Sequence, residues 1–237
     1  MILELNTSQT ITHLQEEKNA TDFVINRVVT ILSKVRPFSD KDVILDIGPG
    51  NGLFFKKIHS KVKRCVGVEA SAGVTMRLVH AFKNYKNVFF CRAFSMRLPF
   101  RDKYFDYIVM NSVIHILRNK KEVIDTLKEI RRVSKDHSLI FIGEVPTVSY
   151  DEEHKIFQKK DTKNIIAKCL IFVKRRLKYL IYKGEPIILP PRYQLYFPTR
   201  KFIRLCETSG FLVRQFGKTV FPKGELETRY DYILEPR

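Results

Sequence analysis

The stretch VILDIGPGNG, residues 43–52, decides the fold. Side chains that favour β-structure run into Asp46, and glycines then occupy positions 48, 50 and 52. A glycine-rich turn after a strand brings backbone N–H groups and a helix N-terminus against a ligand, preferably an anionic group. The stretch therefore predicts a strand, a turn that a ligand approaches closely, and a helix.

Short apolar runs of β type alternate with helical patterns along the chain. Strands that alternate with helices favour a parallel sheet with both faces covered. We therefore expect an α/β fold with a doubly wound, mostly parallel, seven-stranded sheet, helices on both faces, and a helical insertion before the last two strands. The expected strands are 43–47, 65–69, 88–91, 105–110, 139–144, 211–216 and 230–234. The expected helices are 22–35, 53–60, 72–83, 120–134, and one that Thr199 caps and Gly210 ends.

One segment interrupts this alternation. Residues 145–198 separate two expected strands by far more than the usual connection of a few residues. We interpret this segment as an insertion with helices of its own, closed by the proline-rich stretch GEPIILPPRYQLYFPT. The sequence shows no internal repeat, so residues 1–237 are expected to form a single domain.

The chain has 237 residues, of which 44% are hydrophobic, and this is enough for one substantial core. No basic and apolar leader pattern opens the chain, and no apolar run approaches the roughly 20 residues that span a bilayer. The cysteines are too scattered for a metal or redox pair, so we expect reduced thiols, no metal site and a cytoplasmic location. They are Cys65, Cys91, Cys169 and Cys206.

The chain is strongly basic, with a net charge of +18. Half of this charge lies between Lys155 and Lys183, where ten basic residues accompany one acid, Asp161. Apolar residues recur there at helical spacing, and most basic residues lie off that stripe. Such a helix can cover an acidic substrate, lie on an anionic membrane or bind nucleic acid, and it can equally be a packed helix with solvated lysines.

The spacing of the glycines argues against a dinucleotide. Dinucleotide folds use G-x-G-x-x-G, whereas here the third glycine comes one residue early and Leu53 holds its place. Asp46 would repel a pyrophosphate but can bond a cationic amine. Glu69, in VGVEAS at residues 66–71, ends the next strand, where an acid can accept both ribose hydroxyls of an adenosine. S-adenosyl-L-methionine fits these features; alternatively, the turn is only a turn and Glu69 is a solvated acid.

With these motifs the chain resembles the class I, Rossmann-like S-adenosylmethionine-dependent methyltransferases, over roughly residues 20–145 and the last two strands. ILDIGPGNG looks like the first motif of that family, and VGVEAS looks like its ribose-binding loop. FSMRLPFRDKYFDYIVMNSVIHIL resembles the adenine loop and the fourth strand with its exit. LKEIRRVSKDHSLIFIGEVP and RKFIRLCETSGFLV are similar to the helix–strand units that follow. The resemblance implies S-adenosyl-L-methionine as cofactor and methyl transfer as activity.

The resemblance also implies which residues hold the cofactor. Family members often carry an acid before Leu98 that accepts the adenine amino group, but this loop reads AFSMR and has no carboxylate. Adenine is then expected to bond the backbone of Ser95 or Met96 and to pack on Phe94 or Met96. The implied cofactor residues are Asp46, Gly48, Pro49, Gly50, Gly52, Glu69, Ala70, Phe94, Ser95, Met96, Asn111 and Ser112.

Transfer to an alcohol needs a held nucleophile and a group that takes its proton. His115 lies just past the fourth strand and is the first candidate for a base or an orienting group, because the pKa of histidine suits proton transfer. A merely packed histidine is the alternative. Glu144, Tyr193 and Tyr196 are further candidates, with a structural role as the alternative for Glu144. Asp106 is interpreted as a structural acid at the start of a strand.

In the family, the element between the fifth and sixth strands commonly covers the substrate, so the basic insertion 145–198 is expected to be a substrate cap. MNSV stands where enzymes that methylate flipped bases carry [DN]-P-P-[YFW], which disfavours that class. The expected function is O-methylation of an anionic small molecule, sugar or glycolipid intermediate, in the cytoplasm or with peripheral contact at the inner membrane surface. RNA methylation with the basic cap, and a non-catalytic cofactor-binding or partner module, are the alternatives.

Overall fold

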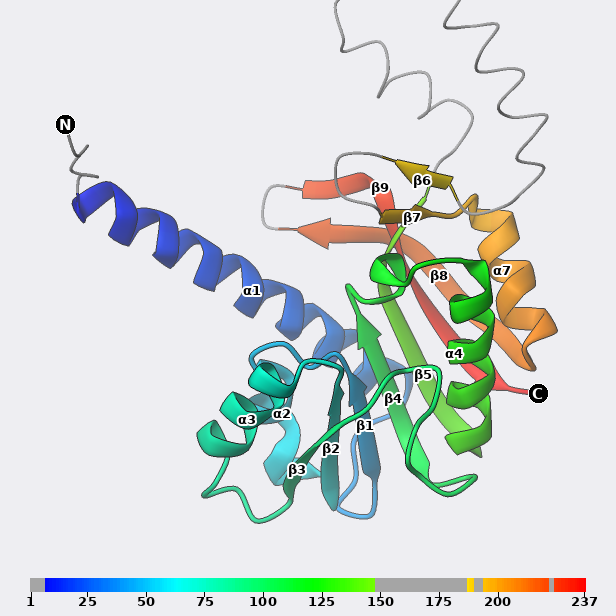
Figure 1. Ribbon diagram of the computed structural model, residues 1–237, viewed down its shortest axis with the longest axis horizontal. Coiled ribbons are helices and arrows are strands. Elements are labelled where there is room, and N and C mark those ends of the chain that lie inside the picture. The colour runs from blue at the N-terminus through cyan, green and yellow to red at the C-terminus, as the bar shows by residue number, and fades with distance from the viewer. Residues whose placement is uncertain (1–6, 148–186, 190–193, 222–223) are drawn as a thin grey trace, which may run out of the picture.

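Seven strands form the main sheet of the protein (Figure 1). The structure is a computed structural model that describes residues 7–147, 187–189, 194–221 and 224–237. The strands lie in the order β3 (Val88–Arg92), β2 (Arg64–Glu69), β1 (Val43–Ile47), β4 (Phe105–Asn111), β5 (Ser134–Pro146), β9 (Gly224–Pro236) and β8 (Phe211–Phe221). Strands β1 to β5 are parallel, and β9 runs antiparallel to both of its neighbours. This confirms the expected α/β fold with a mostly parallel sheet.

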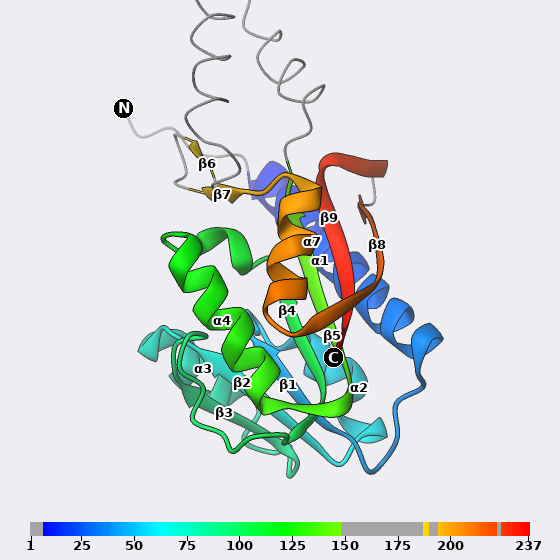
Figure 2. The same cartoon turned by 90° about the vertical axis from the view of Figure 1, so that its right-hand side faces the viewer.

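Helices cover both faces of the sheet. On one face, buried side chains of α1 (Thr7–Val35), α2 (Leu53–Ile58) and α3 (Ala72–Ala81) pack against the strands. On the other face, α4 (Lys120–Val133) and α7 (Thr199–Thr208) do the same. Figure 2 shows α4 and α7 together over one side of the sheet. Successive side chains of a strand point to opposite faces of the sheet. In β1, Ile44 packs on the face that carries α1, α2 and α3, and Leu45 packs on the face that carries α4 and α7.

The carboxyl ends of the three central strands lie side by side. Asp46 of β1 is in register with Gly67 of β2 and with Val109 of β4. The order of the strands reverses between β1 and β4, and ligands of such sheets bind in the crevice outside that switch point. Of the two short 3-10 helices, η2 (Ile114–Ile116) follows β4 at this edge, and η1 (His59–Lys61) precedes β2 at the opposite edge.

Three strands, β5, β8 and β9, extend beyond their expected bounds by more than one residue. Strand β5 begins with the polar residues 134–138, whose sequence carries no β signal, but the backbone of Ser134 pairs with Phe105 of β4. Strands β8 and β9 extend beyond their apolar parts because they pair with each other as a hairpin. The prediction that Thr199 caps α7 was wrong. Pro198 holds the cap position, and the Thr199 hydroxyl lies 2.9 Å from the hydroxyl of Thr147.

The insertion falls mostly outside the described residues, because residues 148–186 and 190–193 are not described. Its described part contains a two-stranded antiparallel ribbon, β6 (Ile187–Leu189) and β7 (Gln194–Tyr196), which the sequence did not predict. Among the helices that are described, none is long and apolar enough to cross a membrane.

Candidate functional site

The glycine turn between β1 and α2 is shaped by the protein's own side chains. Gly48, Gly50 and Gly52 have positive φ angles of 74°, 58° and 72°. A Cβ atom on Gly48 would lie 2.5 Å from Val113 Cγ2, and one on Gly52 would lie 2.5 Å from Phe82 Cε2. A Cβ atom on Gly50 would meet nothing within 4 Å. At Gly48 and Gly52 the packing of the chain already requires glycine, and Gly50 alone faces open space.

Three backbone donors of this turn and of the start of α2 are already bonded within the protein. Gly48 N donates to Val68 O at 2.8 Å, and Gly52 N donates to Pro49 O at 2.8 Å. Leu53 N, at the start of α2, donates to Asn51 Oδ1 at 3.0 Å. The first N–H group of α2, which was expected to face an anionic group, is therefore bonded to Asn51. Gly50 leaves open space beside the turn for a ligand.

Asp46 opens onto a cavity of about 210 Å³ beside this turn. The carboxyl group is buried, with the residue 4% exposed. Burial raises the pKa of Asp46 to about 7 from its ordinary value of 3.8, and no hydrogen bond or cation from the described residues counteracts this rise. A cationic ligand group in the cavity would remove the cost of ionisation. The cavity is lined by Thr21, Ile25, Val28, Asp46, Gly48, Pro49, Gly50, Asn51, Phe54, Val109 and Asn111.

Glu69 lies at the end of the neighbouring strand β2 and is half-buried. Its Oε1 accepts a hydrogen bond of 2.8 Å from Ser71 N, which holds the carboxylate at this edge of the sheet. Ser71 also caps α3 through Val74 N, while the carbonyl of Ala70 accepts a hydrogen bond from Arg92. Glu69 does not line the cavity of Asp46. The two acids thus lie at adjacent strand ends, one inside the cavity and one beyond it.

In the expected adenine loop, the side chain of Phe94 is exposed and the side chain of Ser95 is buried. Phe94 is 56% exposed and forms an isolated bridge with Arg97. The Ser95 hydroxyl is buried and lies 2.9 Å from the hydroxyl of Thr126 on α4. Met96 is half-buried and packs against the core. A ligand at this loop can therefore meet the ring of Phe94 and the backbone, but not the side chain of Ser95.

Backbone strain is concentrated at the ends of β4 and β5. Ser112 and Glu144 have positive φ angles, 58° and 57°, which are uncommon for residues other than glycine and often mark functional sites. Asn111 Nδ2 donates to Glu144 Oε1 at 3.1 Å, and Ser112 N donates to Gly143 O at 3.1 Å. Asn111 Oδ1 is buried and has no hydrogen-bond partner in the described part of the chain. Asn111 Oδ1, at the end of β4, is therefore a hydrogen-bond acceptor available to a ligand in the cavity that Asn111 lines.

His115 on η2 is a buried, neutral histidine, only 5% exposed. Burial, followed by the positive charge of Arg229, lowers the pKa of His115 to about 4. The expectation of a pKa suited to ordinary proton exchange near neutrality was wrong, because that expectation ignored burial. No residue in the described ranges bonds to His115 Nδ1. His115 can therefore accept a hydrogen bond but does not carry a charge at neutral pH.

Comparison with known proteins agrees with this geometry. Residues 45–142, which include the glycine turn, Glu69 and His115, match a family described as a methyltransferase domain. Over these 98 of its 237 residues the chain is similar to the S-adenosylmethionine-dependent methyltransferases. Among curated proteins, none matches the sequence of this chain.

Solved structures share the fold of the methyltransferase at low sequence identity. A 1,6-didemethyltoxoflavin-N1-methyltransferase from Burkholderia thailandensis has a TM-score of 0.66 at 13% identity, over 97% of this chain and 86% of that one. A putative sarcosine dimethylglycine methyltransferase from Galdieria sulphuraria has a TM-score of 0.62 at 12% identity, over 93% and 87%. A SAM-dependent methyltransferase from Methanosarcina mazei has a TM-score of 0.60 at 18% identity, over 84% and 94%.

Several residues of the site escaped the sequence analysis. Arg229 of β9 donates through Nη1 to the carbonyl of Glu144 at 3.1 Å and lies 3.8 Å from its Oε2. Asp231, also on β9, accepts a hydrogen bond of 3.0 Å from Glu144 N. Thr21 and Ile25 of α1 line the cavity of the methyltransferase. No local motif marks these residues, because only the pairing of β5 with β9 and the packing of α1 bring them to the site.

The remaining expected residues have separate fates. Tyr196 of β7 is half-buried, and β7 packs against η2, which carries His115. Tyr193 lies outside the described residues. Asp106 is at the opposite end of β4, where it accepts a hydrogen bond from Val43 N and pairs with Lys135, in keeping with a structural role. In the described ranges of the methyltransferase, no cluster of three or more His, Cys, Asp or Glu could hold a metal ion.

Proposed function

We propose that the methyltransferase moves a methyl group from S-adenosyl-L-methionine to an oxygen of an anionic small molecule, sugar or glycolipid intermediate. One observation carries the proposal. Two buried groups at the carboxyl edge of the sheet lack a partner among the described residues: no cation lies beside Asp46, and no group forms a hydrogen bond with His115 Nδ1. The first suits the amino group of the cofactor, and the second suits the hydroxyl of an acceptor.

Asp46 and its cavity fit the amino acid part of the cofactor. A buried carboxylate without a partner is costly, and an ammonium group would offset that cost. Gly50 leaves room beside it, since a side chain there would point into open space. Asn111 lines the same cavity and supplies a further acceptor through Oδ1. Bound there, the cofactor supplies an electrophilic methyl group on its sulfonium.

The adenosine part is proposed to extend over the ends of β2 and β3. Glu69 would accept the ribose hydroxyls with the oxygen that Ser71 N leaves free. Phe94, which is exposed, would cover one face of the adenine ring, with Met96 beside it. The adenine edge would bond the backbone at Ser95, whose side chain is turned towards α4.

The acceptor is proposed to lie between η2 and the end of β5. His115 would accept the hydrogen bond of the reacting hydroxyl at Nδ1 and hold its proton as the oxygen forms its bond to the methyl carbon. Arg229 would bind the negative group of the acceptor, because it is a cation that adjoins both His115 and Glu144. Glu144 would orient a second hydroxyl or an amine.

The insertion 145–198 is proposed to cap this acceptor within a single methyltransferase domain of residues 1–237. Its basic residues would complement a negative acceptor, and Tyr193 and Tyr196 at its end would contact it. A cytoplasmic location, and peripheral contact at the inner membrane surface, stay predictions.

The proposal is tested with methyl-labelled S-adenosyl-L-methionine and a cell extract fractionated into RNA, lipid, glycan and small metabolites. Label is expected in metabolites, glycan or lipid. Label in RNA alone would contradict the proposal and favour the RNA alternative. Absence of label from every fraction, with cofactor binding intact, would favour a non-catalytic binding module.

A matched pair of variants tests the acceptor site. Arg229→Gln should lower the incorporation of label roughly tenfold, because it removes the cation that faces the acceptor, while cofactor binding stays within about twofold. Arg214→Gln is the control, since Arg214 is exposed on β8 and pairs with Glu235 away from the site. Equal effects of the two substitutions would refute the role of Arg229.

A further inference from the structure

A second cavity lies on the face of the sheet that carries α4, away from the cofactor cavity. The connection from β3 to β4, residues 93–104, contains no helix. The cavity beneath this connection has a volume of about 450 Å³, which suits a small organic ligand. It is lined by β2, β3 and the connection, and it shares no lining residue with the cavity of Asp46.

Aromatic side chains form its walls and are held in place from behind. Phe89 of β3 is 48% exposed and pairs in register with Val66 of β2, so both point to this face. Phe100 and Tyr104 both pack edge-on against Phe105, with ring centroids 5.0 and 4.9 Å away. Phe105 is fully buried. The rings of Phe100 and Tyr104 are therefore pre-organised, which reduces the entropy lost when a ligand binds.

The connection that covers the cavity is clamped to α4. Arg132 of α4 donates to Phe100 O at 2.7 Å, to Leu98 O at 2.9 Å and to Asp102 Oδ1 at 2.8 Å. Glu129 accepts a hydrogen bond of 2.7 Å from Leu98 N and holds the guanidinium of Arg132. Such a network makes the connection a rigid wall rather than a loose loop.

Two guanidinium groups border the aromatic walls. Arg64 lies over the ring of Phe89 at 5.3 Å and donates through Nη1 to the hydroxyl of Tyr104 at 3.0 Å. Arg101 lies over the ring of Tyr104 at 5.0 Å. Neither arginine forms an ion pair with a carboxylate among the residues that the structure describes, so their remaining donors can meet an anion.

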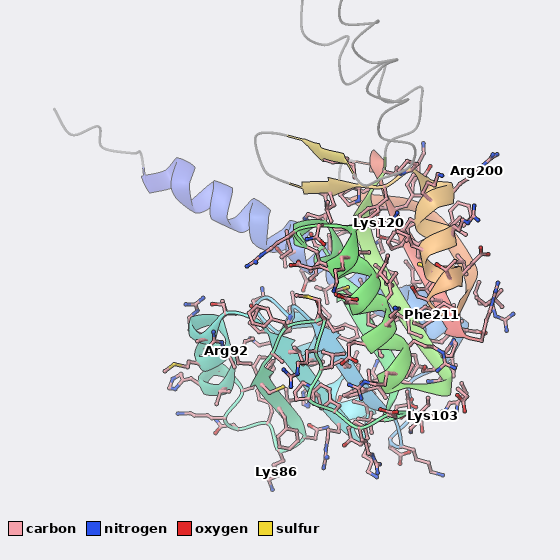
Figure 3. All side chains as sticks on the ribbon, turned by 45° about the vertical axis from the view of Figure 1, so that its right-hand side comes forward. Lys86, Arg92, Lys103, Lys120, Arg200 and Phe211 are labelled. Atoms are coloured by element: carbon pink, nitrogen blue, oxygen red, sulfur yellow. The ribbon has the colours of Figure 1, made fainter. Side chains whose placement is uncertain are left out.

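The stretch of chain that supplies the lining residues is strongly basic. Residues 53–104 contain twelve Lys or Arg and two acids, Glu69 and Asp102. In Figure 3 the labelled Lys86 and Arg92 mark the two ends of β3, and Lys103 lies in the connection that leads into β4. This field attracts an anionic ligand and gives no comparable attraction to a neutral one.

We propose that this cavity binds a nucleoside monophosphate unit, with its base stacked on Phe89 and its phosphate bound by Arg64 and Arg101. The unit comes either as a free nucleotide or as one residue of single-stranded RNA, since both present the same base and phosphate. Bases stack readily on aromatic side chains, and arginine binds phosphate through paired donors. The proposal does not depend on the acceptor of the methyl group.

The test is calorimetric titration of the full chain with uridine 5′-monophosphate, in the presence of saturating S-adenosyl-L-homocysteine. Because the nucleotide carries uracil instead of adenine and the cofactor site is filled by S-adenosyl-L-homocysteine, binding of the nucleotide at the cofactor site is excluded. Phe89→Ala should weaken the binding of the nucleotide roughly fivefold or more, and Arg101→Ala should weaken it about tenfold. Arg77→Ala, an equal loss of charge on the exposed face of α3, should change it by less than about twofold.

A second arm uses an octamer of uridine and distinguishes the two sources. If the octamer binds much more tightly than the mononucleotide and Phe89→Ala weakens both, the unit belongs to RNA; equal affinities indicate a free nucleotide. Either result supports the site. No binding at millimolar nucleotide, or equal weakening by Arg77→Ala and Arg101→Ala, would overturn it. Thermal unfolding of each variant shows that the fold is kept.

Discussion

Replacing Asp46 with asparagine should make the protein more stable and, at the same time, a poorer binder of its cofactor. Asp46 is buried beside the glycine turn, and burial raises its pKa to about 7 from 3.8. The substitution keeps the shape of the side chain and removes its ionisation. Opposite changes in stability and binding are typical of a group kept for function.

The size of the gain in stability follows from this pKa. The unfolded chain releases the proton of Asp46 near pH 4, whereas the folded protein keeps it until about pH 7. The free energy of unfolding of the native protein therefore falls between these pH values and stays low above them. A shift of about three units corresponds to roughly 4 kcal/mol. Asp46→Asn should gain up to this amount at pH 8 and nothing at pH 3.

The loss in binding follows from the same carboxylate. An ammonium group of the ligand favours the ionised form, so affinity for S-adenosyl-L-homocysteine should rise with pH and level off above about 7. A hydrogen bond between charged groups contributes about 1.5–3 kcal/mol. Asp46→Asn should therefore weaken binding roughly ten- to a hundred-fold and remove this pH dependence.

Denaturant unfolding at pH 3 and pH 8, and calorimetry with S-adenosyl-L-homocysteine at pH 6 and pH 8, measure both effects. Asp40→Asn is the control, because Asp40 is exposed and, among the described residues, its side chain bonds only its neighbour Ser39; the substitution should change neither quantity. A destabilised Asp46→Asn variant that binds the ligand with native affinity would refute the reasoning.

Three further predictions follow from the site and its surroundings. Gly52→Ala should lower the midpoint of thermal unfolding sharply, because the new Cβ would lie 2.5 Å from the ring of Phe82. Gly50→Ala should reduce the free energy of unfolding by only about 1–2 kcal/mol, because of the positive φ, and its main effect should be weaker cofactor binding, measured by calorimetry. His115→Gln should lower the rate of methyl transfer without changing cofactor affinity, and since the pKa of His115 is about 4, the native rate should show no inflection from this group between pH 6 and 9. Asp106→Asn should reduce the free energy of unfolding by about 1–3 kcal/mol at pH 7, because Lys135 holds the pKa of this carboxyl below its usual range despite burial. This stabilisation is present above the ordinary pKa of the carboxyl and is lost as the pH falls through the lowered pKa. The difference in stability between the variant and the native protein should therefore shrink in acid.

The order of strands and helices could be predicted from the sequence because it depends on local signals. Strand β1 has the expected bounds, Val43–Ile47, since its apolar run ends abruptly at the glycine turn. The ends of β5 and β9 could not be predicted in the same way. Their outer residues are polar, and these residues are held in strands by pairing with partners far along the chain. The part of the insertion between 148 and 186 lies outside the described residues.

Sequence alone determined where Asp46, Glu69 and His115 lie: each is at or just past the carboxyl end of a strand, and these ends must meet at one edge of a parallel sheet. Only the tertiary structure decided their chemical states. Val113 and Phe82 fill the space beside Gly48 and Gly52. Residues of α1 line the cavity at the buried Asp46, and Arg229 of β9 lies near the buried His115. A pKa and an open space depend on atoms brought together from distant parts of the chain, and local sequence patterns do not record that proximity.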